Sequence, residues 1–182
     1  MLALPPVRRL TLTETWDILE ADGIRMPRKR DRTPFVPPHM PQPHDSELGF
    51  SWFKEGWEEG DFNNLTLPRM FIGRSRVAQI AFCNTDLSES RFCWNDFEEC
   101  DFTDADLHGA DLRSSLWLRC RFENANLSGA DLRHSQFTDC VFNGALLTKA
   151  VLTRDQVEVL PFTEEQRQSV IVKRMGAYPS GG

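Results

Sequence analysis

A large apolar residue returns at every fifth position through the middle of this chain. The stretch 119–148 reads RCRFENANLSGADLRHSQFTDCVFNGALLT, and its recurring residues are Phe122, Leu127, Leu132, Phe137, Phe142 and Leu147. An α-helix repeats every 3.6 residues and a β-strand every two, so neither element produces a strict period of five. The backbone must therefore turn at regular intervals in some other way.

The period of five lies within a period of twenty, and its register runs without insertion from residue 62 to residue 152. Residues twenty apart are alike: one column is Phe62, Phe82, Phe102, Phe122 and Phe142, and the next is Leu67, Leu87, Leu107, Leu127 and Leu147. A four-sided coil explains both periods, because side chains twenty apart then stack at about the interstrand spacing of 4.8 Å. These columns are the predicted core. We number the sides of the coil one to four, with central residues that begin at Phe62, Leu67, Ile72 and Val77.

The five cysteines all lie within the repeats, at Cys83, Cys93, Cys100, Cys120 and Cys140. The last three share one inward column beside the phenylalanines, where a thiol acts as a compact apolar spacer. Metal or redox chemistry is the alternative, although the spacings match no zinc motif. Cys83 and Cys93 are expected to point outward, which makes them the more reactive pair. An odd number of cysteines without a secretion signal favours free thiols and a cytoplasmic location.

The stretches CDFTDADLHGADLR and ENANLSGADLR resemble the A(D/N)LXX signature of pentapeptide repeat proteins. The resemblance covers residues 60–154 and implies an all-β solenoid, a right-handed quadrilateral β-helix of just under five coils. It is specific for the fold and says little about function, since one fold hosts many activities. The role for which the family is best known is mimicry of duplex DNA by an acidic rod that binds a type II topoisomerase such as DNA gyrase.

Different sequence patterns flank the repeats. Residues 1–59 are predicted to hold a short helix, opened by the capping box Thr11-x-x-Glu14, and a proline-rich arm. Residues 155–182 are predicted to form a helical cap with a flexible tail, because Thr153-x-x-Gln156 and Thr163-x-x-Gln166 are two further capping boxes.

The last coil exchanges polar residues for apolar ones in an outward slot. Val141, Leu146 and Val151 stand where earlier coils have Asp101, Asp106 and other aspartates. An apolar outward slot indicates a covered surface. The cover is either the C-terminal helices or a second copy of the protein, which makes a homodimer through this end one expectation.

Side three differs from the other sides in its charge. Its outward slots carry Arg74, Arg91, Arg113, Arg133, Arg154, Trp94 and His134 against Asp111 and Asp131, in a chain of formal net charge −6. A basic stripe with an aromatic anchor suits an acidic partner surface or the protein's own N-terminal arm. On side four, Leu116 and Leu118 are expected to be exposed, which predicts a contact with a partner or with arm residues Trp16, Phe35 and Val36.

We find no catalytic constellation in the sequence and expect neither enzymatic activity nor a cofactor or metal ion. The arm's basic cluster, Arg28 to Arg32, is interpreted as a solvated linker, so nucleic acid is not an expected partner. No apolar run is long enough for a membrane helix. The sequence favours a non-enzymatic protein-interaction module, with a neutralising or protective role. DNA mimicry towards a type II topoisomerase is the alternative, although side three is positive and the other sides are only mildly acidic.

Overall fold

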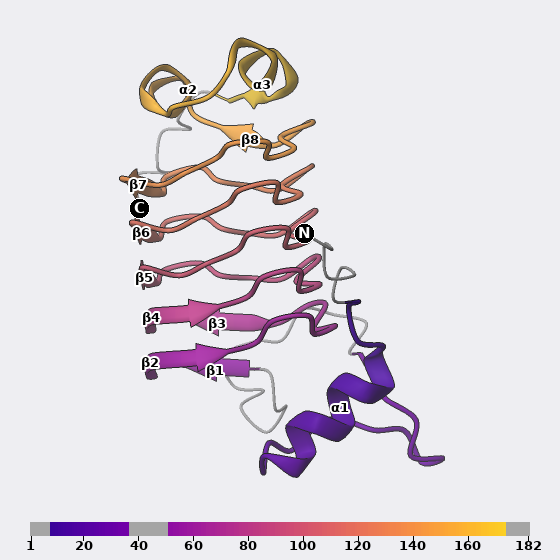
Figure 1. Cartoon of the computed structure of the whole chain (residues 1–182). Helices are drawn as coiled ribbons and strands as arrows, with labels where there is room; N and C mark the ends of the chain where they lie inside the picture. The colour runs from indigo at the N-terminus through magenta and orange to yellow at the C-terminus, as the bar shows by residue number, and fades with distance from the viewer. Residues whose placement is uncertain (1–7, 37–50, 174–182) are drawn as a thin grey trace, which may run out of the picture.

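The computed structural model describes residues 8–36 and 51–173, and the predicted fold class is confirmed. The chain winds into a β-solenoid of about six turns (Figure 1). The strands are β1 (Ser51–Phe53), β2 (Gly56–Asp61), β3 (Phe71–Gly73), β4 (Arg76–Ala81), β5 (Asp96–Glu98), β6 (Leu116–Leu118), β7 (Gln136–Thr138), β8 (Val151–Leu152) and β9 (Ile171–Val172). The helices are α1 (Leu12–Ala21), α2 (Arg154–Val159) and α3 (Glu164–Ser169).

All the strand pairs are parallel, and each joins residues twenty apart. Strands β2, β4, β5, β6 and β7 form a five-stranded sheet on side four. Trp117, for example, pairs with Phe97 on one side and with Phe137 on the other. On side three, β1 pairs with β3 and β8 with β9, and the remaining contacts of the other sides are single bridges with the same spacing, such as Asp101 with Arg121. The predicted period of twenty is therefore the pairing register of the backbone.

Each corner of the coil has one residue in the left-handed backbone region. Every fifth residue from Lys54 to Lys149 has a positive φ, and only Gly109, Gly129 and Gly144 among them are glycines. Aspartates help to fix these corners, since Asp101 Oδ1 accepts a hydrogen bond from the backbone N–H of Thr103 at 2.9 Å. The Asp/Asn slot of the repeat thus has a structural role.

The interior is built from stacked side chains. The phenylalanine column of side one has successive ring centroids 5.6, 5.1, 5.2 and 5.1 Å apart, from Phe62 to Phe142. On side four, Trp117 lies between Phe97 and Phe137, at 4.1 and 6.0 Å. Burying each large apolar side chain contributes about 1.5–3 kcal/mol, so the columns are the main source of stability.

The coil begins earlier than predicted. Strand β1 already pairs with β3, and β2 with β4, so the boundary at residue 60 is wrong and the solenoid gains a turn. Trp52 pairs with Ile72, and Trp57 with Val77, which places both tryptophans on the existing columns. The surrounding residues lack the A(D/N)LXX signature, and for this reason the sequence did not reveal this coil.

Helix α1 has the predicted capping box, and it covers the start of side two. Thr66 N–H donates to Thr15 Oγ1 at 2.9 Å, whereas one coil later Asp86 N–H donates to the carbonyl of Leu65. Trp16 is fully buried and donates from Nε1 to the carbonyl of Pro27. The helix thus supplies contacts that a preceding coil would otherwise make. The rest of the predicted arm, residues 37–50, lies outside the described residues.

The period of twenty continues through the C-terminal cap. Phe162 packs edge-on against Phe142 with ring centroids 5.2 Å apart, and β9 pairs with β8, so both segments keep their columns. Helix α2 takes the place of a side of the coil between β8 and Phe162, and helix α3 takes the place of another between Phe162 and β9 (Figure 1). Both predicted capping boxes are present. The predicted flexible tail, residues 174–182, is likewise outside the described residues.

Two glutamines of the cap complete the hydrogen bonds of the last coil. Gln156 Nε2 donates to the carbonyls of Leu132 and Ser135 at 2.7 and 2.8 Å. Gln166 Nε2 donates to those of Phe142 and Ala145, both at 2.9 Å. In inner coils the next coil satisfies such carbonyls. Because a buried carbonyl without a partner is costly, these side chains allow the coil to end.

We predict that Gln156→Glu lowers the free energy of unfolding by about 1–3 kcal/mol, measured by chemical denaturation. The carboxylate can still accept at the capping box but cannot donate to the two carbonyls. Gln168→Glu is the control, because among the described residues the Gln168 side chain bonds only to the exposed Glu164, and a change of at most about 0.5 kcal/mol is expected there. Equal effects of the two substitutions would contradict the proposed role of Gln156.

Candidate partner-binding surfaces

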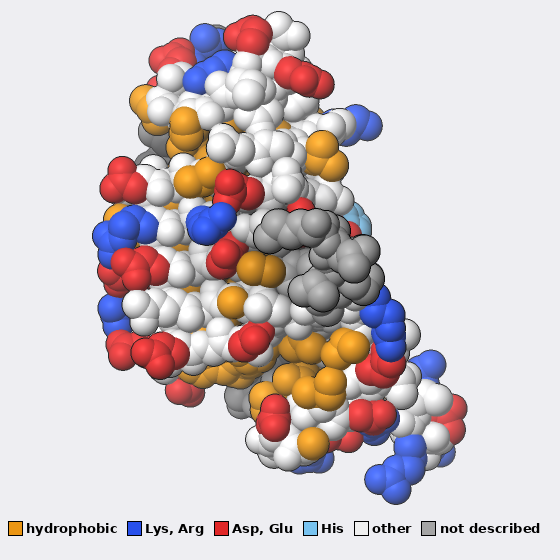
Figure 2. All heavy atoms as spheres, in the orientation of Figure 1, with side chains coloured by type: hydrophobic (Ala, Val, Ile, Leu, Met, Phe, Trp, Pro, Cys, Tyr) orange, Lys and Arg blue, Asp and Glu red, His pale blue; other side chains and the backbone are white. Residues whose placement is uncertain are grey.

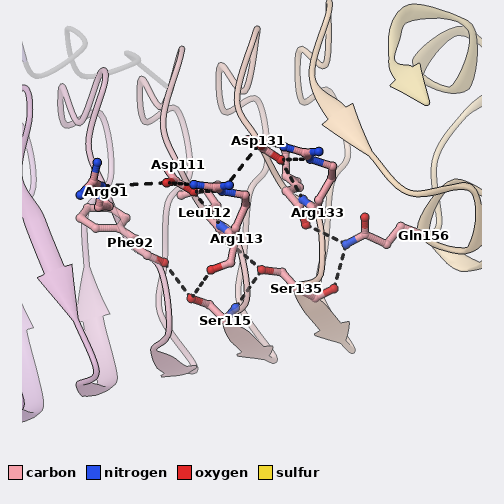
Figure 3. Close-up of polar contacts among 11 residues, drawn as sticks. Arg91, Phe92, Asp111, Leu112, Arg113, Ser115, Asp131, Arg133, Ser135 and Gln156 are labelled. Carbon is pink, nitrogen blue, oxygen red and sulfur yellow. Dashed lines mark hydrogen bonds and ion pairs between the residues drawn. The ribbon is translucent and has the colours of Figure 1, made fainter. Parts of the chain in front are cut away.

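The arginines of side three alternate with aspartates (Figure 3). Arg113 Nε and Nη2 each lie 2.8 Å from an oxygen of Asp111, and Arg133 makes the same two-pronged contact with Asp131 at 2.9 and 2.7 Å. These bonds raise the pKa of both guanidinium groups. Burial acts to raise the pKa of Asp131, but the bonds from Arg133 outweigh it and the pKa is lowered. This part of the predicted basic stripe is therefore largely neutralised.

The serines beneath this ladder hold the coil together. Ser115 Oγ donates to the carbonyl of Phe92 at 2.7 Å and Ser135 Oγ to that of Leu112, as Figure 3 shows. Both serines are buried. Their hydroxyl groups are thus occupied by backbone carbonyls, which is a structural role.

The other end of side three carries a cleft of about 210 Å³. Its lining includes the predicted binding residues Arg74, Arg91 and Trp94. The other lining residues are Phe53, Phe71, Gly73 and Cys93. Trp94 is 62% exposed. His134 is exposed at the same kind of corner two coils further along, outside this cleft. Sequence reasoning missed Phe53 because its coil was missed, whereas the apolar Phe71 in an outward slot was a signal that could have been used.

Side four presents an apolar centre with a charged rim. Leu116 is 47% exposed and Leu118 is half-buried, both on strand β6, between β5 and the edge strand β7. Around them Arg119 contacts Glu98 and Glu99 at 2.7 and 2.9 Å, and Arg76 contacts Glu98 at 3.0 Å. Figure 2 shows positive and negative side chains interspersed over these strands. Where the structure describes the N-terminal arm, it docks at the first coil through Thr15 and leaves Leu116 exposed.

The three apolar residues of the last coil differ in their cover. Val151 pairs with Ile171, so strand β9 of the same chain lies over it. Val141 is half-buried. Leu146 remains 57% exposed and lines a cleft of about 260 Å³ beside α3. The C-terminal segment thus accounts for part of the predicted covered surface, and Leu146 is left open.

The inward cysteines are spacers that donate weak hydrogen bonds. Cys100 Sγ lies 3.4 Å from the carbonyl of Val77, and Cys140 Sγ 3.3 Å from that of Trp117. Cys83 and Cys93 are half-buried. Burial raises the pKa of Cys83 to about 11 and also raises the pKa of Cys93. In the described part of the chain, no group of histidines, cysteines and carboxylates could hold a metal ion.

The repeat geometry agrees with a family model. The model for pentapeptide repeats matches eight copies over residues 79–113 and 119–154. This part of the chain is a pentapeptide-repeat domain. No curated protein matches the chain. Within residues 8–36 and 51–173, no helix is long and apolar enough to cross a membrane.

Several solved structures of pentapeptide-repeat proteins are similar to this chain. A protein from the Arabidopsis thaliana thylakoid lumen is 28% identical over 63% of this chain and 73% of its own, with a TM-score of 0.45. Rfr23 from the cyanobacterium Cyanothece is 19% identical over 54% of this chain and 85% of its own, with a TM-score of 0.33. A trypsin-treated form of QnrB1, a plasmid-mediated fluoroquinolone resistance protein, is 15% identical over 57% of this chain and 64% of its own, with a TM-score of 0.34.

We predict that the thiol of Cys83 reacts with iodoacetamide at pH 8 about 100-fold more slowly than a free cysteine, because its raised pKa leaves little thiolate. The rate should keep rising as the pH approaches 11. Peptide mapping after timed alkylation measures it, and the protein in guanidinium is the control. A rate equal to that of free cysteine at pH 8 would show that Cys83 is a reactive thiol after all.

Proposed function

We propose that this protein is a non-enzymatic protein-interaction module whose partner binds side four, and that it acts by neutralising or protecting that partner. The observation that carries the proposal is the exposed Leu116, beside the half-buried Leu118, on strand β6 of the five-stranded sheet. Protein interfaces commonly have an apolar centre and a polar rim. Because the coil is already ordered, it loses little conformational entropy on binding.

The rim of side four also favours a specific partner. Arg76 and Arg119 are each held between carboxylates, so their positions are set before a partner arrives. Rim charges contribute mainly to the rate and selectivity of association, while a buried leucine contributes affinity. The pentapeptide-repeat fold, which generally serves as an interaction module, agrees with this role.

Mimicry of DNA, directed at DNA gyrase, is the alternative, and it has less support. A DNA mimic needs a continuous negative surface, whereas Arg76 and Arg119 lie among the carboxylates of side four. Figure 2 shows positive side chains among the negative ones. Side three carries arginines throughout. A cytoplasmic location is part of our proposal, since all five cysteines are free thiols and reducing compartments keep them so.

We predict that Leu116→Gln with Leu118→Thr weakens partner binding at least tenfold and leaves the melting temperature unchanged. The two replacements copy Gln136 and Thr138, which occupy the same slots on β7, so the fold should accept them. Losing the burial of two leucines costs more than the roughly 1.4 kcal/mol of a tenfold change. A photo-crosslinking residue at position 116, used in the source cells, identifies the partner by mass spectrometry.

The matched control is the same crosslinker at position 121, which has the same slot on side one. Equal adducts at both positions, or none at position 116, would overturn the proposed surface. Supercoiling by purified DNA gyrase should be unaffected by an excess of the protein, and inhibition there would favour the DNA-mimic alternative.

We further propose that two copies associate through the C-terminal end, around the exposed Leu146. Leu146→Lys should then convert a dimer to a monomer, as measured by size-exclusion chromatography with light scattering. Asn143→Lys, an exposed position in the same coil, is the control. A wild-type protein that stays monomeric at high micromolar concentration would exclude this dimer.

A further inference from the structure

Trp94 occupies a position where a tryptophan does not stabilise the fold. It is a corner residue with a φ of 66° and a side chain 62% exposed. The left-handed region crowds the Cβ of most residues and favours glycine and asparagine. Asn84 and Asn124 hold the equivalent corners of side one. Since Trp94 gains neither a favourable backbone nor burial, its presence points to a contact with something outside the chain.

The neighbours of Trp94 form a cleft with aromatic walls. Phe53 and Phe71 stack with ring centroids 6.4 Å apart. The tip of the Phe71 ring approaches Gly73, where an added Cβ would come within 2.6 Å of Phe71 Cζ. The absence of a side chain at Gly73 therefore makes room for the Phe71 ring in the lining of the cleft. Trp94 completes the lining.

The same cleft is positively charged. Arg74 lies one coil before Trp94 at the same corner slot, and Arg91 lies three residues before it. Arg91 Nε is buried and has no hydrogen-bond partner among the described residues, because Asp111 Oδ2 is 3.9 Å away. Among the described residues that line the cleft, none is acidic. A buried N–H without an acceptor favours a ligand that brings one.

We propose that this cleft binds an acidic segment of a partner protein that contains an aromatic residue. Carboxylates of the segment accept hydrogen bonds from Arg74 and Arg91, and its aromatic ring packs against Trp94 and Phe53. The cleft, at about 210 Å³, is smaller than the usual 300–1,000 Å³ of a small-molecule pocket, and a single side chain suits it better. This inference rests on the proposed protein-binding function but concerns a different side of the coil.

Single-stranded nucleic acid also offers rings and negative charge, but the surface beyond the cleft opposes it. A strand requires a track of free positive charges along its phosphates. On side three, the next arginines, Arg113 and Arg133, are each paired with an aspartate. A short acidic peptide needs only the cleft itself.

The test uses the two outward cysteines as reporters in one molecule. Cys93 lines the cleft, whereas Cys83 has the same repeat slot on the opposite side of the coil. The probe is the peptide acetyl-Glu-Glu-Phe-Glu-Glu-amide at millimolar concentration. We expect it to slow the alkylation of Cys93 at pH 9 at least fivefold and to leave Cys83 unchanged. The analogue with Gln in place of Glu should protect at least fivefold less.

Variants that suit the left-handed corner keep the test independent of folding. Trp94→Asn and Arg74→Asn should each remove the protection and leave the melting temperature unchanged or higher. Lys149→Asn removes a charge from a corner on side two and should have no effect on protection.

Three results would overturn the inference. They are protection that persists in Trp94→Asn, equal protection by the Gln analogue, and stronger protection by oligothymidylate than by the acidic peptide. If the peptide fails while the crosslinker at position 116 still captures a partner, only this inference is wrong. If both fail, the proposed function is wrong as well.

Discussion

Every part of this structure depends on the stacking of like residues from one coil to the next. The ring of Phe102 lies 5.1 Å from that of Phe82 and 5.2 Å from that of Phe122, so each coil covers its two neighbours. Backbone hydrogen bonds follow the same spacing, as between Phe102 N–H and the carbonyl of Arg121. A single coil could bury little by itself, and stability is a property of the stack.

Because each coil is stabilised by its neighbours, the first and last coils have backbone groups without a partner coil. Other segments of the chain supply partners for these groups at both ends. At the start, α1 brings Thr15 to the free N–H of Thr66. At the finish, Gln156 and Gln166 donate to carbonyls that the next coil would otherwise satisfy. Helices can serve here because they keep the column positions on either side of them, as Phe162 does above Phe142.

The coil also separates the residues that fold it from those that can bind. An inward side chain must pack against the residue twenty positions away. An outward residue needs only to adopt the backbone conformation that its position in the coil requires. Leu116 and Trp94 are outward residues that improve neither core packing nor backbone geometry. A binding surface is expected at outward residues of this kind, because their presence is not explained by the stability of the fold. The arginines of side three that pair with aspartates, in contrast, are already satisfied by contacts within the solenoid.

The sequence by itself determined the coil, its columns and its caps, because stacking makes the same residue recur every twenty positions and capping boxes depend only on local spacing. It did not reveal the coil of Trp52 and Trp57, since two apolar residues without the signature do not define a register. Only the tertiary structure decided which charges are free. Whether Arg113 is neutralised depends on side-chain geometry, namely its 2.8 Å contact with Asp111. Likewise, the cleft of Phe53, Arg74 and Trp94 exists because the coil brings together residues twenty or more positions apart in the chain.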